Sequence, residues 1–189
     1  MEAFFLSTGV VALAEMGDKT QLLALVLAAR YRRPVPIVMG IFVATLANHA
    51  LAAAAGAWMT TVLGKETLRW ILGFSFIAMG VWTLIPDKLD RKESKHLRLG
   101  VFGVTLIAFF LVEMGDKTQV ATVALAAKYS SFMAVLAGTT LGMMIANVPA
   151  VLLGEKLIRN VSVRLVHLIA AAIFVVLGVL ALFNVGHAF

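Results

Sequence analysis

The chain has 189 residues, of which 61% are hydrophobic and 14% charged, and its formal net charge at pH 7 is +6. This composition excludes an ordinary soluble domain, in which about a quarter of the residues are charged. The absence of cysteine excludes disulfides, thiolate metal sites and thiol nucleophiles. We therefore expect an all-α integral membrane protein, in contact with lipid and not with nucleic acid, whose basic residues mark one side of the membrane.

Six apolar stretches are long enough to cross a bilayer as helices, which takes ~20 residues each. Short polar stretches separate them, so consecutive stretches should pair as helical hairpins. The first begins without basic residues and contains Glu15, Asp18 and Lys19, so we expect a membrane helix there and not a cleavable signal peptide. The six expected transmembrane helices are residues 3–29, 35–60, 67–85, 99–127, 132–153 and 165–185.

Lysine and arginine are distributed unequally between the two sides of the expected bundle. The loops after the first, third and fifth helices share one side and hold 11 of these residues, whereas the opposite side holds 3, namely Lys65, Arg69 and Lys128. The positive-inside rule places the side with 11 in the cytoplasm and both chain termini outside it. The 11 residues are Arg30, Arg32, Arg33, Lys88, Arg91, Lys92, Lys95, Arg98, Lys156, Arg159 and Arg164.

A seven-residue motif, Glu-Met-Gly-Asp-Lys-Thr-Gln, occurs at residues 15–21 and again at 113–119, 98 positions later. The similarity extends further, because residues 14–31 and 112–129 are identical at 11 of 18 positions. Each half contains three expected helices, and because three is odd the second half must cross the membrane in the opposite sense. The sequence therefore predicts six transmembrane helices as two inverted three-helix repeats, with a site near the midplane where the repeats meet. The expected organisation is one transmembrane domain, residues 1–189, divided into repeat 1 (1–86), a cytoplasmic linker (87–98) and repeat 2 (99–189).

Each motif places two carboxylates and an amine inside an apolar segment, where a central Asp or Lys costs ~2.5–3.5 kcal/mol. On a continuous helix, Glu15, Asp18 and Lys19 would share one face, and Lys19 would follow Glu15 at the spacing that favours an ion pair. Gly17 would point away and allow a neighbouring helix to approach closely. Gly17 could instead mark a break in the helix, and the geometry of the motif would then change.

Together the two motifs hold four carboxylates and two amines, a formal charge of −2 that one divalent cation or two protons would neutralise. Oxygen ligands suit Ca²⁺, Mn²⁺ or Mg²⁺ better than Cu⁺ or structural Zn²⁺. We interpret Lys19 and Lys117 as counter-charges, because a protonated amine cannot bind a cation. The candidate carboxylate ligands are Glu15, Asp18, Glu113 and Asp116, and the candidate neutral ligands are Asn48, Asn147, Thr20, Thr118, Gln21 and Gln119.

Three further polar residues have alternative interpretations. Asn48 and Asn147 could cross-link helices instead of binding a cation. His49 is deep enough in its segment to shuttle protons, but Val148 stands at the equivalent place in the second half, which favours a packing or hydrogen-bonding role.

The motif Glu-x-Gly-Asp-Lys-Thr, written twice in a chain of six expected helices, closely resembles that of a family of small cation/proton exchangers. This family includes the Golgi Ca²⁺/Mn²⁺ transporters of eukaryotes and the manganese exporters of bacteria. The resemblance implies export of Mn²⁺ or Ca²⁺ from the cytoplasm, driven by inward protons and without a prosthetic group. It assigns the family's acidic motif positions to Glu15, Asp18, Glu113 and Asp116, and its motif Lys and Thr positions to Lys19, Lys117, Thr20 and Thr118. The short cytoplasmic loop is typical of the bacterial members, which predicts a location in the bacterial inner membrane.

Other functions compete with this one. A cation channel with an acidic ring would conduct without proton coupling. An exporter of amino acids or organic cations would have a larger and less acidic site. An intramembrane enzyme could use the paired acids, but the sequence offers neither a nucleophile nor a phosphate-binding loop, so we expect no enzymatic activity. The sequence leaves the oligomeric state open.

Overall fold

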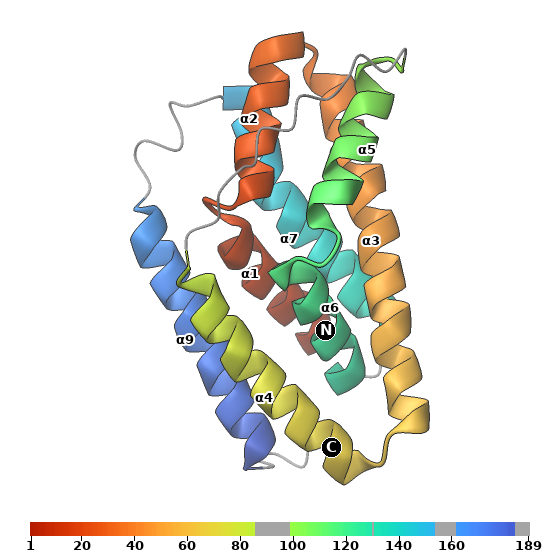
Figure 1. Ribbon diagram of the computed structural model, residues 1–189, viewed down its shortest axis with the longest axis vertical. Coiled ribbons are helices and arrows are strands. Elements are labelled where there is room, and N and C mark those ends of the chain that lie inside the picture. The colour runs from red at the N-terminus through yellow and green to blue at the C-terminus, as the bar shows by residue number, and fades with distance from the viewer. Residues whose placement is uncertain (86–98, 130, 154–161, 184–189) are drawn as a thin grey trace.

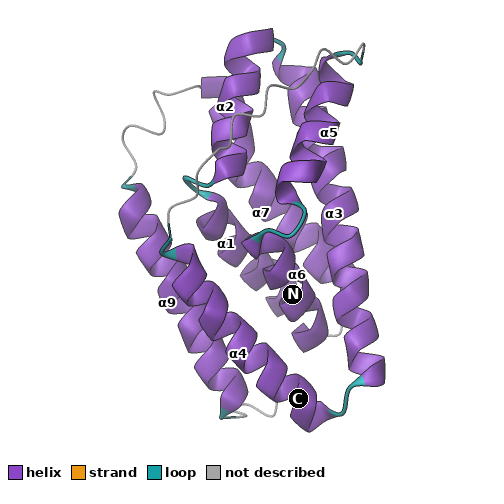
Figure 2. Cartoon of the chain, viewed as in Figure 1, coloured by secondary structure: helices purple, strands orange, loops and turns teal. Residues whose placement is uncertain are grey.

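A computed structural model of the protein describes residues 1–85, 99–129, 131–153 and 162–183. In these ranges the chain folds into helices joined by turns and loops, with no strand (Figures 1 and 2), so the predicted all-α class is confirmed. The expected linker 87–98 lies outside the described residues, and so do Lys156 and Arg159 of the last expected cytoplasmic loop. The helices are α1 (Glu2–Glu15), α2 (Lys19–Tyr31), α3 (Pro34–Val62), α4 (Lys65–Thr83), α5 (Val101–Glu113), α6 (Lys117–Tyr129), α7 (Phe132–Leu153) and α9 (Val163–Leu182).

Three of the described helices are long and apolar enough to cross a membrane unaided. They are α3, α7 and the part of α9 from Arg164 to Leu182, which correspond to the expected helices 35–60, 132–153 and 165–185. Helix α5 is apolar but shorter. The expected helix 67–85 is present as α4, whose first turns carry the charged residues Lys65, Glu66 and Arg69.

The expectation of one continuous helix over residues 3–29 and another over 99–127 is wrong, because each of these segments forms two shorter helices. The chain leaves α1 at Glu15 and enters α2 at Lys19, and it leaves α5 at Glu113 and enters α6 at Lys117. Both breaks therefore fall inside the repeated motif. In Figure 1 the pair α1–α2 and the pair α5–α6 run in opposite directions along the long axis of the molecule.

The two halves of the chain are interleaved. Helix α1 packs chiefly on α7, and α3 packs on α5 and α6, so each of these contacts joins the first half to the second. Glycines make two of the approaches close: a Cβ atom on Gly138 of α7 would lie 2.5 Å from the carbonyl oxygen of Phe4, and one on Gly40 of α3 would lie 2.9 Å from that of Phe102. Helices α4 and α9 form a separate pair beside this group (Figure 1), with Phe76 and Phe174 stacked between them.

Replacing Gly138 with alanine is expected to lower the thermal stability of the detergent-solubilised protein. The new methyl group would meet backbone and not a flexible side chain, so α1 and α7 would have to separate, at a cost of about 1–3 kcal/mol. Gly9→Ala is the matched control, because Gly9 is also helical and has open space around its Cβ position. Equal melting temperatures for the two variants would contradict this account of the α1–α7 contact.

Candidate functional site

The break between α1 and α2 is a tight turn built on Gly17. Met16 has φ −63° and ψ 117°, Gly17 has φ 81°, and the amide of Asp18 donates to the carbonyl oxygen of Glu15 at 3.0 Å. These values are typical of a type II turn, which requires a positive φ at its third residue and therefore favours glycine there. The expectation that Gly17 serves close helix approach is thus wrong, and its role as a helix break is confirmed.

The second motif forms the same turn. Met114 has φ −65° and ψ 120°, Gly115 has φ 78°, and the amide of Asp116 donates to the carbonyl oxygen of Glu113 at 3.1 Å. In both copies the aspartate is therefore the last residue before a new helix, and the glutamate is the last residue of the preceding one. The two acids of each motif consequently lie on either side of a turn and not on one helical face.

A glutamine closes each turn. The amide N–H of Gly17 donates to Gln21 Oε1 at 2.8 Å, and that of Gly115 donates to Gln119 Oε1 at the same distance. Gln21 also donates through Nε2 to the carbonyl oxygen of Ala146, at 2.8 Å, which ties the first turn to α7. Because these side-chain oxygens already accept a backbone hydrogen bond, their observed role is to support the turn.

The lysines of the two motifs reach across to the opposite motif. Lys19 Nζ lies 3.0 Å from Asp116 Oδ1, and Lys117 Nζ lies 2.6 Å from Asp18 Oδ1. The predicted pair between Glu15 and Lys19 depends on a continuous helix that the protein does not have. Each lysine follows its turn directly, which places it at the start of a helix facing the other half.

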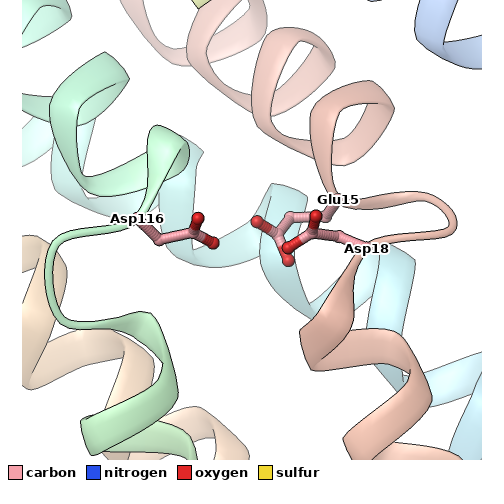
Figure 3. A group of neighbouring side chains, drawn as sticks. All are labelled: Glu15, Asp18 and Asp116. Atoms are coloured by element: carbon pink, nitrogen blue, oxygen red, sulfur yellow. The ribbon is translucent and has the colours of Figure 1, made fainter. Parts of the chain in front are cut away.

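Three of the four predicted carboxylates converge. Glu15, Asp18 and Asp116 each offer an oxygen within 4.8 Å of those of the other two, and all three side chains are buried. Figure 3 shows them pointing toward one another from the two turns, Glu15 and Asp18 from the first and Asp116 from the second. The arrangement concentrates hard oxygen ligands contributed by both halves of the chain, which is a geometry suited to a divalent cation.

The fourth carboxylate, Glu113, is buried but has different neighbours. Its Oε1 lies 3.5 Å from His49 Nε2 and accepts a hydrogen bond from Thr118 Oγ1 at 3.2 Å. In the first motif, Thr20 Oγ1 donates in the same way to Glu15 Oε2. The threonines thus orient the glutamates, and His49 lies beside the glutamate of the second motif.

The side-chain amides of the two asparagines donate hydrogen bonds to different parts of the structure. Asn48 Nδ2 donates to the carbonyl oxygen of Phe110 at 3.0 Å, which links α3 to α5, whereas Asn147 Nδ2 donates within α7 to that of Met143 at 3.1 Å. Both side chains are fully buried, and neither Oδ1 atom has a hydrogen-bond partner among the described residues. Asn48 therefore does cross-link helices, and both residues keep an acceptor oxygen available.

His167 is a neighbour of the site that the sequence did not single out. It lies on α9, and its Nε2 is 2.7 Å from the carbonyl oxygen of Met16 in the first turn. The available signal was a histidine inside an apolar segment, which on its own is compatible with simple packing. Met114, the equivalent of Met16 in the second turn, is 54% exposed, whereas Met16 is only partly exposed, so the two turns differ in how they are covered.

The chain is similar to a family of membrane transporters along nearly its whole length. The pattern of the family described as "Divalent cation/proton antiporter GDT1" matches residues 3–91 and 101–188. A Vibrio cholerae protein named "Putative manganese exporter" is 48% identical over 184 residues, covering 97% of this chain and 92% of that protein. A GDT1-like protein of Synechocystis is 27% identical, covering 96% and 97%, and GDT1-like protein 5 of Arabidopsis thaliana is 26% identical, covering 96% of both. No solved structure matches the chain significantly.

Proposed function

This chain belongs to the GDT1 family of divalent cation/proton antiporters, and on that basis we propose that it exports Mn²⁺ from the cytoplasm in exchange for protons. Ca²⁺ is the alternative cargo. The observation that carries the proposal is the convergence of Glu15, Asp18 and Asp116 from two separate turns into one buried group. The name of the Vibrio cholerae relative supports manganese over calcium.

The charges of the site provide the coupling between cation and protons. The acids Glu15, Asp18, Glu113 and Asp116 bind the cation, and the Oδ1 atoms of Asn48 and Asn147 are supporting ligands. With the two motif lysines protonated, the site carries a formal charge of −2, which either one divalent cation or two protons neutralise. Because an uncompensated charge inside a membrane is costly, the site carries either the divalent cation or two protons whenever its access switches from one side of the membrane to the other.

The membrane arrangement we propose has six crossings in two inverted halves, with α1–α2 and α5–α6 each forming one broken crossing. The opposite directions of these pairs in Figure 1 support this arrangement. Irregular backbone at membrane depth is tolerated where protein buries it, and the carbonyl ends of broken helices attract cations in other transporters with inverted repeats. The excess of lysine and arginine in the expected cytoplasmic loops favours an orientation with both termini outside the cytoplasm. The similarity to a bacterial exporter supports a location in the bacterial inner membrane.

Purified protein in liposomes with an acidic interior is expected to accumulate Mn²⁺ added outside and to raise the internal pH as it does so. Outward movement of protons drives the uptake, so an uncoupler that collapses the pH gradient should abolish accumulation. Parallel measurements with Ca²⁺ and Mg²⁺ determine the preferred cargo. Mn²⁺ flux that follows only the Mn²⁺ gradient, unchanged by the pH gradient, would indicate a channel and contradict the exchange mechanism.

A further inference from the structure

The ammonium groups of two lysines form ion pairs with two of the three carboxylates in the buried acid group, which consists of Glu15, Asp18 and Asp116. Lys117 Nζ is 2.6 Å from Asp18 Oδ1, and Lys19 Nζ is 3.0 Å from Asp116 Oδ1. The same two aspartates offer oxygens to the group that also contains Glu15. A cation that entered this group would therefore meet oxygens already in contact with fixed positive charges.

The two pairs also join the halves of the protein. Each lysine belongs to one motif and each aspartate to the other, so the pairs cross between the turn after α1 and the turn after α5. A counter-charge needed only for neutrality could come from a neighbouring residue on the same helix. In the crossed arrangement, the contact between the two turns instead depends on whether the aspartates bind the lysine ammonium groups or another cation.

We propose that Lys19 and Lys117 are displaceable internal cations, which yield their aspartate oxygens when a divalent cation binds and reclaim them when it leaves. The inference rests on the proposed function and adds a mechanism of release to it. Binding breaks the two crossed pairs and frees the turns to move relative to one another. Return of the ammonium groups to Asp18 and Asp116 competes with the cation and favours its departure.

The two lysines should contribute unequally. The Lys117 side chain is 1% exposed and its pair with Asp18 is the shorter one, whereas Lys19 is 23% exposed. Solvent screens the interactions of an exposed charge more strongly than those of a buried one. Removal of the Lys117 charge should therefore change the affinity for the cation more than removal of the Lys19 charge.

The test compares Mn²⁺ affinity and turnover in Lys19→Met, Lys117→Met and the control Lys65→Met, whose lysine begins α4 outside the motifs. Free Mn²⁺ is measured by electron paramagnetic resonance in titrations of each purified protein, with melting curves to show that it is folded. Each motif variant should bind Mn²⁺ about tenfold more tightly or more, because a like charge a few ångströms away is removed. Its rate of Mn²⁺/H⁺ exchange at saturating Mn²⁺ should fall, because release is slower, and Lys65→Met should match the unmodified protein in both respects.

A second measurement uses the unmodified protein. Mn²⁺ should increase the rate at which a small amine-reactive reagent labels Lys19, as quantified by mass spectrometry, because the ammonium group has left Asp116. If a methionine variant does not fold, this labelling decides the question. Folded motif variants that bind Mn²⁺ no more tightly than the unmodified protein, or a labelling rate that Mn²⁺ leaves unchanged, would overturn the proposal. Absence of Mn²⁺ binding by the unmodified protein would instead count against the proposed function itself.

Discussion

Glu15→Gln is expected to reduce Mn²⁺/H⁺ exchange at least 100-fold while leaving the protein folded. Glutamine has almost the volume of glutamate and keeps a side-chain oxygen that can accept the hydrogen bond from Thr20. It removes one negative charge from the three-acid group, so a single divalent cation no longer balances the site. Even residues that only orient metal ligands contribute roughly 10–100-fold in affinity, so loss of a direct carboxylate ligand should cost at least as much. The measurement is the initial rate of pH-driven Mn²⁺ uptake into liposomes.

The matched control is Glu66→Gln. Glu66 is 75% exposed at the start of α4, where it pairs with Arg69 at 2.6 Å, far in sequence from either motif. Its replacement should leave transport unchanged, since surface pairs of this kind contribute little. Glu113→Gln, which alters the fourth carboxylate, should also stop exchange. Rapid transport by Glu15→Gln, or an equal loss in the Glu66 variant, would refute the assignment of the cation site.

Gly115→Ala is expected to destabilise the protein by about 1–2 kcal/mol, because an L-residue is disfavoured at a positive φ by roughly this amount. Gly115 has φ 78°, and apart from its two chain neighbours no residue has an atom within 4 Å of the position that a Cβ would occupy. The cost therefore comes from the backbone alone and not from a clash. Because the turn positions Glu113 and Asp116, we expect Mn²⁺ transport to fall together with the melting temperature.

Gly64→Ala provides the comparison for the turn. Gly64 precedes α4 with φ −62° and also has open space around it, so alanine fits there without strain. Melting curves in detergent and initial transport rates should separate the two variants clearly. If Gly115→Ala were as stable and as active as Gly64→Ala, the type II turn would not be the feature that shapes the motif.

The helical class and the position of the acids could be read from the sequence, but the sequence could not decide whether Gly17 continues its helix or breaks it. Met16 and Gly17 stand in an apolar segment where glycine is common even in continuous membrane helices. The turn becomes apparent only when the positive φ of Gly17 and the hydrogen bond from its amide to Gln21 are known. The sequence therefore identifies the acids of the motif, three of which the structure brings together, and misplaces the geometry of the motif.

The partners of the charged residues also could not be predicted from the local sequence pattern. Helical spacing relates Lys19 to residues on its own helix, whereas its partner Asp116 is brought close by the packing of two distant turns. For the same reason the sequence did not separate Glu113 from the other three acids, nor did it connect His167 with the first turn. Repetition identified the residues, and only the three-dimensional packing determines which of them meet.

The interleaving of the two halves also constrains how the protein is made. Helix α1 packs chiefly on α7. Gly138 of α7 contacts the backbone at Phe4 of α1 and follows Phe4 by 134 residues in the sequence. At synthesis rates of about 5–20 residues per second, the ribosome needs roughly 7–27 s to produce this partner. The first helix must therefore remain in the nascent chain with its packing surface uncovered for that time, and the fold can close only late in translation.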